Sequence, residues 1–332
     1  MSSAALRSGH KTVVALSGGI GGAKLALGLK RVLPAGALSV IANTGDDFEH
    51  LGLTVSPDID TLVYTLAGLS NTAQGWGRAD ETWTFMAALA ALGGPDWFQL
   101  GDGDLAMHVM RTHRLAGGET LTAITADMAQ LLGVGAAILP MADQPVRTKL
   151  LTADGVRDFQ NYFVRQRAEP PITGVLYAGV EAAEVTAAVR AVLSDPALAA
   201  IVIAPSNPLI SIEPILAVPG MRDAIRQAGV PVVAVSPIIA GQAVKGPTAK
   251  MMRELGQEPT AANVLERYRG LVDAFIADPA DIGDLEGQGE GVTLIGANVM
   301  MRTLEDRDRL ARLVIETAAS LVAGAASRTG EP

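Results

Sequence analysis

The sequence predicts an α/β fold, a Rossmann-like, doubly wound and mostly parallel sheet with a mainly helical insertion. Short, continuous aliphatic runs alternate with helical patterns, which is typical of parallel strands covered by helices on both faces. A glycine-rich turn joins the first aliphatic run to the first helical pattern, as at many phosphate sites. With 332 residues, the chain is long enough for one large α/β domain or two smaller ones.

The elements follow in order from this pattern. The first strand is predicted over residues 12–16 and the first helix over 23–33. Further aliphatic runs predict strands over 38–42, 136–139, 199–204, 231–235 and 292–295. Further helical patterns predict helices over 181–193, 220–228, 248–255, 262–277 and 302–322.

Residues 65–135 interrupt the alternation, because they offer few strand candidates and contain helical stretches such as 121–132. We expect them to form a mainly helical insertion that caps the sheet. The domain prediction is therefore a flexible N-terminal tail over 1–10 and a single α/β nucleotide-binding domain over 11–325. The acid- and glycine-rich segment 278–291 is expected to be a mobile loop without a function of its own.

Composition excludes several classes of function. Although 49% of the residues are hydrophobic, no apolar run approaches the roughly 18 residues of a transmembrane helix, and the polar start lacks the long apolar region typical of a signal peptide. We expect a cytoplasmic protein that does not bind membranes. The net charge of −9 argues against nucleic acid as a partner. The absence of cysteine excludes disulfides, thiolate zinc sites and cysteine nucleophiles, so oxygen ligands and Mg²⁺ are favoured.

The first strand runs into S-G-G-I-G-G-A-K, which places backbone N–H groups at a helix N-terminus, where an anion is favoured. Glycine lets the backbone approach a phosphate closely. The dinucleotide fingerprint fails because Lys24 occupies its third glycine position, and a Walker A loop fails because no hydroxyl follows Lys24. A tight turn without a ligand is the alternative. The predicted phosphate-binding residues are Gly18, Gly19, Gly21 and Gly22.

Four acids follow the second predicted strand, in the motifs N-T-G-D-D and S-P-D-I-D. Ligands of doubly wound sheets lie beyond the carboxyl ends of the strands. Four carboxylates near a glycine turn suit an oxygen-ligated divalent cation between phosphates, although one acid could cap a helix and another could be exposed. Of Asp46, Asp47, Asp58 and Asp60, we favour Asp46 and Asp60 as the metal ligands.

Three later segments carry further candidates. The turn L-G-D-G-D-L holds Asp102 and precedes His108, whose five-residue spacing from His113 does not match a zincin, so a histidine bonding a substrate hydroxyl or the backbone is favoured. In the turn P-S-N-P-L, the serine and asparagine side chains either form hydrogen bonds with the backbone of the turn or contact a nucleotide. A lysine-containing loop before residue 248 is a second candidate anion site at a helix start. The side chains singled out in the last two segments are Ser206, Asn207, Lys245 and Lys250.

Eight motifs occur in one order between residues 17 and 247. They are S-G-G-I-G-G-A-K, N-T-G-D-D, S-P-D-I-D-T, L-G-D-x-D-L-A-x-H, L-P-M-A-D-Q-P-V-R-T, P-S-N-P-L-I-S-I, L-A-V-P-G-M-R and V-A-V-S-P-I-I-x-G-x-A-V-K-G-P. Together they closely resemble the CofD family, the 2-phospho-L-lactate transferases of coenzyme F-420 biosynthesis. The resemblance implies a Rossmann-like domain with an insertion. The chain departs from the family at Gln99 and Gly103, where members often carry a basic residue.

The resemblance also implies the reaction. A GDP-activated three-carbon acid gives its phospho-acid unit to the terminal ribitol hydroxyl of the deazaflavin FO, and GMP leaves. The acid is 2-phospholactate, phosphoenolpyruvate or 3-phosphoglycerate, and the sequence does not distinguish them. In-line displacement at phosphorus needs positioning and charge neutralisation rather than a covalent nucleophile. Clustered carboxylates, lysines and a glycine turn fit that need.

Carried over motif by motif, the resemblance implies a role for each candidate. Asp46 and Asp60 are the predicted catalytic residues and would hold Mg²⁺, with Asp60 near the acceptor hydroxyl. Asp102, His108 and Asp60 would line the deazaflavin side. Replacing Asp60 with asparagine is expected to abolish transfer and leave the fold intact. The residues assigned to the GDP moiety are Gly18, Gly19, Gly21, Gly22, Ser206, Asn207 and Lys245.

Two other functions compete with transfer. A non-enzymatic, nucleotide-sugar-binding regulator of the related gluconeogenesis-factor family shares the glycine turn, but such proteins carry P-G-D-I-R where this chain has P-D-I-D. An NAD-linked dehydrogenase predicts a third fingerprint glycine where Lys24 stands and has no use for four clustered acids. A homodimer is the default expectation for the assembly.

Overall fold

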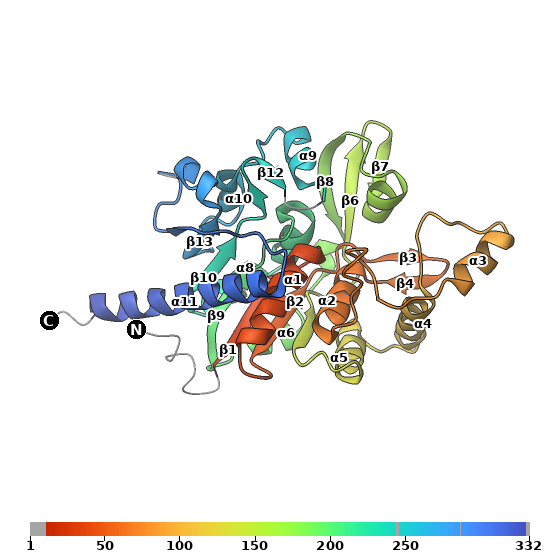
Figure 1. Ribbon diagram of the computed structural model, residues 1–332, viewed down its shortest axis with the longest axis horizontal. Coiled ribbons are helices and arrows are strands. Elements are labelled where there is room, and N and C mark those ends of the chain that lie inside the picture. The colour runs from red at the N-terminus through yellow and green to blue at the C-terminus, as the bar shows by residue number, and fades with distance from the viewer. Residues whose placement is uncertain (1–10, 244–245, 286, 330–332) are drawn as a thin grey trace.

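The computed structural model of the protein describes residues 11–243, 246–285 and 287–329. The predicted tail over 1–10 and Lys245 lie outside these residues. At the centre is a seven-stranded sheet with the strand order β14-β13-β10-β9-β1-β2-β5, in which every neighbouring pair is parallel (Figure 1). The predicted doubly wound α/β fold is confirmed. No helix within the described ranges combines the length and apolar character needed to cross a membrane.

The strands of this sheet are short and aliphatic, and most are buried on both faces. In β1, Val14 and Leu16 face one half of the hydrophobic core, whereas Val13 and Ala15 face the other half. This alternation follows from the two-residue period of a strand. The strands are β1 (Thr12–Ser17), β2 (Leu38–Ala42), β5 (Ala137–Pro140), β9 (Leu198–Ile203), β10 (Val232–Val235), β13 (Ala274–Ala277) and β14 (Thr293–Gly296).

Helices cover both faces. One half of the core is closed by α1 (Gly19–Val32), α2 (Pro57–Ala67), α5 (Leu121–Leu131) and α11 (Leu304–Thr329). The other half is closed by α6 (Ala187–Leu193), α7 (Glu213–Ala217), α8 (Met221–Gln227), α9 (Thr248–Glu254) and α10 (Ala261–Arg267). The 3₁₀ turn Val180–Ala182 precedes α6 in the region predicted as one helix over 181–193, and the π-helical turn Pro208–Ile212 precedes α7.

Residues 65–135 are mainly helical, as predicted. They contain α3 (Thr84–Ala91), α4 (Asp102–Ala116) and α5, and they follow the hairpin of β3 (Phe48–His50) and β4 (Leu53–Val55). Figure 1 shows α3, α4 and this hairpin together at one end of the molecule, with α11 running toward the opposite end.

An antiparallel sheet was not predicted. It has the order β7-β6-β8 and consists of β6 (Arg147–Thr152), β7 (Gly155–Asp158) and β8 (Ile172–Ala178), with the π-helical turn Asn161–Arg165 between β7 and β8. A two-stranded hairpin, β11 (Ile238–Ile239) and β12 (Gln242–Ala243), completes the strands among the described residues.

The predicted helix over 262–277 is wrong in its second half. The chain leaves α10 at Arg267, turns at Gly270 with φ of +68°, and enters strand β13. Phe275 and Ile276 are fully buried between β10 and β14. An apolar run of only four residues is too short to distinguish a strand from a buried helix by its pattern. Burial on both faces of the sheet makes this run a strand.

The expected mobile loop over 278–291 is partly ordered by contacts with the domain. Two 3₁₀ turns, Pro279–Asp281 and Gly283–Leu285, occupy its first part. Leu285 is fully buried. The carboxylate of Asp281 accepts hydrogen bonds from the Ala240 N–H at 3.0 and 3.1 Å. This segment therefore holds the β11–β12 hairpin in place, a role that its composition did not predict.

Candidate functional site

The strand order reverses between β1 and β9, so the carboxyl ends of these two strands form the topological switch point of the sheet. From β1 the chain continues to β2 and β5 on one side, and β9 continues to β10, β13 and β14 on the other. Ligands of doubly wound sheets bind at this switch point. The glycine turn follows β1 here, and the P-S-N-P-L turn that contains Ser206 (the Ser206 turn) follows β9. The Gly18 N–H donates to Ser206 Oγ at 3.3 Å.

The glycine turn is more helical than predicted. Helix α1 begins at Gly19 instead of residue 23, so Gly21 and Gly22 belong to its first turn. A Cβ at Gly21 would lie 2.5 Å from the carbonyl oxygen of Pro205, and a Cβ at Gly22 would lie 2.5 Å from Ser206 Oγ. Glycine is therefore required for α1 to pack against the segment that follows β9.

Replacing Gly21 with alanine is expected to lower the free energy of unfolding by about 1–3 kcal/mol, because the new methyl group would displace backbone at Pro205. Thermal unfolding measures the effect. Gly283→Ala is the matched control, since nothing lies within 4 Å of a Cβ there. Equal unfolding temperatures for both variants would contradict the packing argument.

Asp58 occupies the start of α1. Its Oδ1 accepts from the Gly19 N–H at 2.6 Å and its Oδ2 accepts from Asn43 Nδ2 at 2.8 Å. The same Asn43 amide donates to the carbonyl of Ile210 at 3.1 Å, and its Oδ1 accepts from the Gly45 N–H. One of the four acids is thus a helix cap, as the sequence allowed, but it caps α1 rather than the helix in which it lies.

Asp46 and Asp47 are buried close to this cap. Asp47 Oδ2 accepts from Ser56 Oγ at 2.9 Å, whereas Oδ1 of Asp46 and Oδ1 of Asp47 have no hydrogen-bond partner among the described residues. Burial, followed by the charge of Asp58, raises the pKa of Asp46 well above its usual range. Burial raises the pKa of Asp47 to about 7 and that of Asp58 to about 6. A divalent cation would relieve this accumulation of buried carboxylates.

The pKa of Asp47 predicts a pH-dependent loss of stability. Because its pKa is higher in the folded chain, its contribution to stability is full below the unfolded value of about 4 and is lost as pH rises toward about 7. The stability of Asp47→Asn relative to the unchanged protein should therefore increase across this window. Urea unfolding without divalent metal measures the difference. A constant difference would contradict the buried position of the charge.

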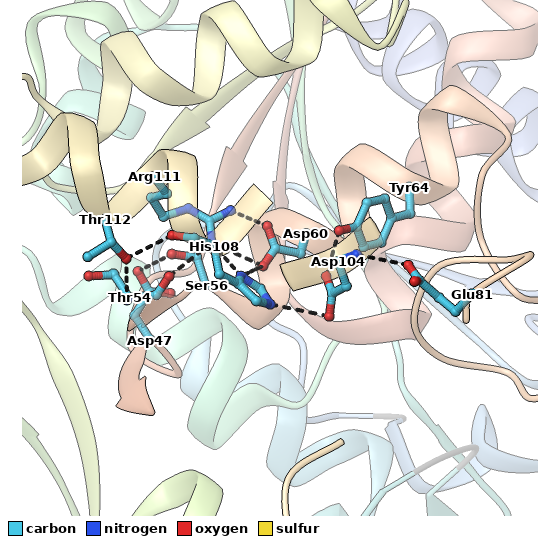
Figure 2. Close-up of polar contacts among 10 residues, drawn as sticks. All are labelled: Asp47, Thr54, Ser56, Asp60, Tyr64, Glu81, Asp104, His108, Arg111 and Thr112. Atoms are coloured by element: carbon cyan, nitrogen blue, oxygen red, sulfur yellow. Dashed lines mark hydrogen bonds and ion pairs between the residues drawn. The ribbon is translucent and has the colours of Figure 1, made fainter. Parts of the chain in front are cut away.

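Asp60 lies in a second network, between α2 and α4 (Figure 2). Both of its oxygens accept from Arg111, with 3.3 Å between Asp60 Oδ2 and Nη1 and a shorter contact between Oδ1 and Nη2. The Arg111 side chain is only 1% exposed. Burial raises the pKa of Asp60, and the charge of Arg111 opposes that rise. Asp60 is therefore a paired carboxylate, unlike Asp46.

His108 joins Asp60 to Asp104. Its Nδ1 lies 3.2 Å from Arg111 Nη1 and 3.7 Å from Asp60 Oδ2, and its Nε2 lies 3.2 Å from Asp104 Oδ2. Tyr64 donates from its hydroxyl to Asp104 Oδ1 at 2.6 Å. The network was only half predicted. The spacing of these residues could have indicated the network. Residues 104, 108 and 111 lie on one face of α4, and residues 60 and 64 lie on one face of α2.

The remaining predicted residues have contacts of their own. Asp102 accepts from Thr82 Oγ1 at 2.5 Å and from the N–H groups of residues 84 and 85 at 3.1 and 3.0 Å, which orders the start of α3. Asn207 Oδ1 accepts from the Leu209 N–H at 2.9 Å and caps the turn that follows β9. Lys250 pairs with Glu254 at 2.6 Å.

Among the described residues, one cluster brings three potential metal-ligand atoms together, and Asp46 and Asp47 offer further buried carboxylate oxygens. Ligand atoms of Asp60, Asp104 and His108 lie within 4.8 Å of one another, but Arg111 contacts both Asp60 and His108 and would repel a cation. Asp46 and Asp47 each offer a buried carboxylate oxygen without a partner in the described part of the chain. The donor chemistry therefore fits Mg²⁺ better at Asp46 than at Asp60.

Comparison with known proteins gives consistent matches. Residues 13–290 match the family described as "2-phospho-L-lactate transferase CofD". A "Phosphoenolpyruvate transferase" of Streptomyces coelicolor is 42% identical over 307 residues, covering 90% of this chain and 96% of that protein. A "2-phospho-L-lactate transferase" of Methanosarcina mazei is 35% identical over 305 residues, covering 92% and 99%. A crystal structure of a UPF0052 family protein from Bacillus halodurans has a TM-score of 0.62 at 17% identity, covering 92% and 98%, and supports the fold.

Proposed function

Because this chain belongs to the CofD family of transferases, we propose that it acts in coenzyme F-420 biosynthesis on the deazaflavin FO. It transfers a phospho-three-carbon-acid unit from the GDP-activated acid to the terminal ribitol hydroxyl of FO, and GMP leaves. The observation that supports this best is the buried carboxylate group beside the glycine turn at the switch point. The regulator and dehydrogenase alternatives are not favoured, because the curated relatives are named as transferases.

The donor we propose is the GDP-linked form of phosphoenolpyruvate. The Streptomyces relatives at 41–42% identity carry that substrate in their names, and the Methanosarcina relatives at 35–36% carry 2-phospho-L-lactate. The three candidate acids differ by a methyl, a methylene or a hydroxyl group. Such a difference is worth about 1–3 kcal/mol in a pocket, so discrimination of roughly 10- to 200-fold is expected.

The phosphate side of the proposed site lies at the glycine turn. Gly21 and Gly22 bring α1 against the Ser206 turn, and Asp58 fixes the first N–H of the helix. We place the donor diphosphate at this switch point, where the N-terminus of α1 favours an anion. Asp46 would hold a Mg²⁺ ion there, because its Oδ1 lacks a partner among the residues that the structure describes. When bound, the ion neutralises phosphate charge during displacement.

Asp60 belongs to the acceptor side in this proposal. Its two oxygens are held by Arg111, so it would have to give up that contact to be the second metal ligand that the sequence predicted. We therefore propose that Asp60 accepts the proton of the ribitol hydroxyl. The hydroxyl oxygen forms a bond to the transferred phosphorus as the phosphoanhydride bond to GMP breaks, and GMP takes the departing electron pair.

A mixing experiment tests the proposed function. The purified protein is incubated with FO, Mg²⁺ and each of the three GDP-linked acids, and the products are identified by mass spectrometry. We expect a phosphodiester of FO together with GMP, formed fastest with the phosphoenolpyruvate donor. A reaction without FO is the control for donor hydrolysis. No phosphodiester with any donor, together with binding of a nucleotide sugar, would contradict the transferase assignment.

A further inference from the structure

We propose that Arg111 is a positioning residue of the acceptor side, which fixes the orientation of both the Asp60 carboxylate and the His108 ring. This inference rests on the proposed function, because the role of Asp60 toward the ribitol hydroxyl is part of it. Arg111 was not among the residues that the sequence singled out. It is one of the largest fully buried side chains among the described residues.

The Arg111 guanidinium contacts three residues at once. Its Nη1 lies 3.3 Å from Asp60 Oδ2, 3.3 Å from the carbonyl oxygen of Thr54 and 3.2 Å from His108 Nδ1. Its Nη2 donates to Asp60 Oδ1. A planar fork that holds both carboxylate oxygens fixes the plane of the carboxylate, which a lysine ammonium cannot do as a point charge.

Arg111 also determines the tautomer of His108. Arginine can only donate, so the nitrogen of His108 that faces it must be the acceptor. The proton of a neutral His108 ring then lies on Nε2, which faces Asp104 Oδ2 at 3.2 Å. Asp104 is held from its other oxygen by the Tyr64 hydroxyl at 2.6 Å. Arg111 therefore donates to both Asp60 and His108 Nδ1, and this leaves the proton of a neutral His108 ring on the nitrogen that faces Asp104.

The burial of Arg111 has an energetic cost. Arg111 is 1% exposed, and its burial opposes the charged form, yet its closest partner is a carboxylate that is also buried. Replacing such a pair by apolar side chains is often neutral or stabilising for a fold. Joining α2 to α4 through this ion pair therefore costs free energy that apolar side chains would not cost. The function of the pair is to orient the Asp60 carboxylate.

The test compares Arg111→Lys with Arg114→Lys in the complete protein. Arg114 lies three residues after Arg111 on α4 and pairs with Glu119 and Asp127 near the surface. For Arg111→Lys we expect kcat for transfer to fall about 100-fold, as a displaced reacting group commonly causes, with KM for the GDP-linked donor unchanged. Arg114→Lys should keep the kcat of the unchanged protein. An unchanged kcat in Arg111→Lys, with only a lower unfolding temperature, would overturn the inference.

A second measurement does not depend on activity. Nitrogen-15 spectra of histidine-labelled protein report which ring nitrogen carries the proton, and His108→Gln assigns the signal. We expect an unprotonated Nδ1 and a protonated Nε2 in the unchanged protein, and a change in this pattern in Arg111→Lys. A proton on Nδ1 in the unchanged protein would overturn the inference. If the unchanged protein made no phosphodiester, the proposed function would fail, and the spectra would still decide how Arg111 orients His108.

Discussion

Replacing Asp60 with asparagine is expected to lower transfer by about 10²- to 10⁴-fold, the range that a positioned proton acceptor contributes. The structure adds a cost that the sequence did not predict. Asp60 neutralises the buried Arg111, so the variant leaves a buried cation without a carboxylate. We expect the free energy of unfolding to fall by about 3–5 kcal/mol. Transfer is followed by GMP release and stability by urea unfolding.

A double variant separates these two effects. In Asp60→Asn/Arg111→Met both charges of the pair are absent, so stability should return toward that of the unchanged protein. Transfer should remain absent, because the proton acceptor is still missing. If the double variant regained transfer along with stability, Asp60 would have only a structural role and the acceptor-side assignment would be wrong.

Replacing Asp46 with asparagine is expected to have opposite effects on activity and stability. The variant removes a carboxylate whose pKa is raised well above its usual range by burial and by Asp58. In metal-free buffer near neutral pH the unfolding temperature should rise by about 2 °C or more, which corresponds to roughly 1 kcal/mol in a chain of this size. Transfer with Mg²⁺ should fall by at least about 100-fold, because the phosphate charge is no longer neutralised.

Asp158→Asn is the matched control for Asp46→Asn. Its carboxylate is 63% exposed and pairs with Lys149 on the small antiparallel sheet. We expect its stability to stay within about 0.5 kcal/mol of the unchanged protein and its transfer rate to be the same. A loss of stability in Asp46→Asn, measured without metal, would contradict the view that Asp46 is a strained, cation-binding carboxylate.

Most of the central sheet could be predicted because its signals are local. Six of the seven strands appear as short aliphatic runs, and burial on both faces of a parallel sheet requires such runs. The glycine turn and the Ser206 turn could be expected to meet, since each follows a strand that ends at the same edge. Strand β13 was missed because four apolar residues fit either period, and only its neighbours β10 and β14 decide it.

The partners within the site could not be predicted in the same way. Either Asp58 or Asp60 was expected to cap the helix that contains both, and Asp58 instead accepts a hydrogen bond from the N–H of Gly19, which lies 39 residues earlier in the chain. Asp60 was grouped with Asp46 because they lie close in sequence. The pairing of Asp60 with Arg111 depends on how α4 docks against α2, across 51 residues of chain. Such contacts are set by helix packing rather than by any pattern within one segment.

We propose that Asp46 holds the Mg²⁺ that serves the donor diphosphate beside the glycine turn. Titration calorimetry of GDP tests this proposal, with the unchanged protein and with Asp46→Asn, each with Mg²⁺ and with a chelator. We expect Mg²⁺ to strengthen GDP binding to the unchanged protein and to have little effect on Asp46→Asn, because the coupling free energy between ion and nucleotide passes through this carboxylate. An equal effect of Mg²⁺ on GDP binding to both proteins would contradict it.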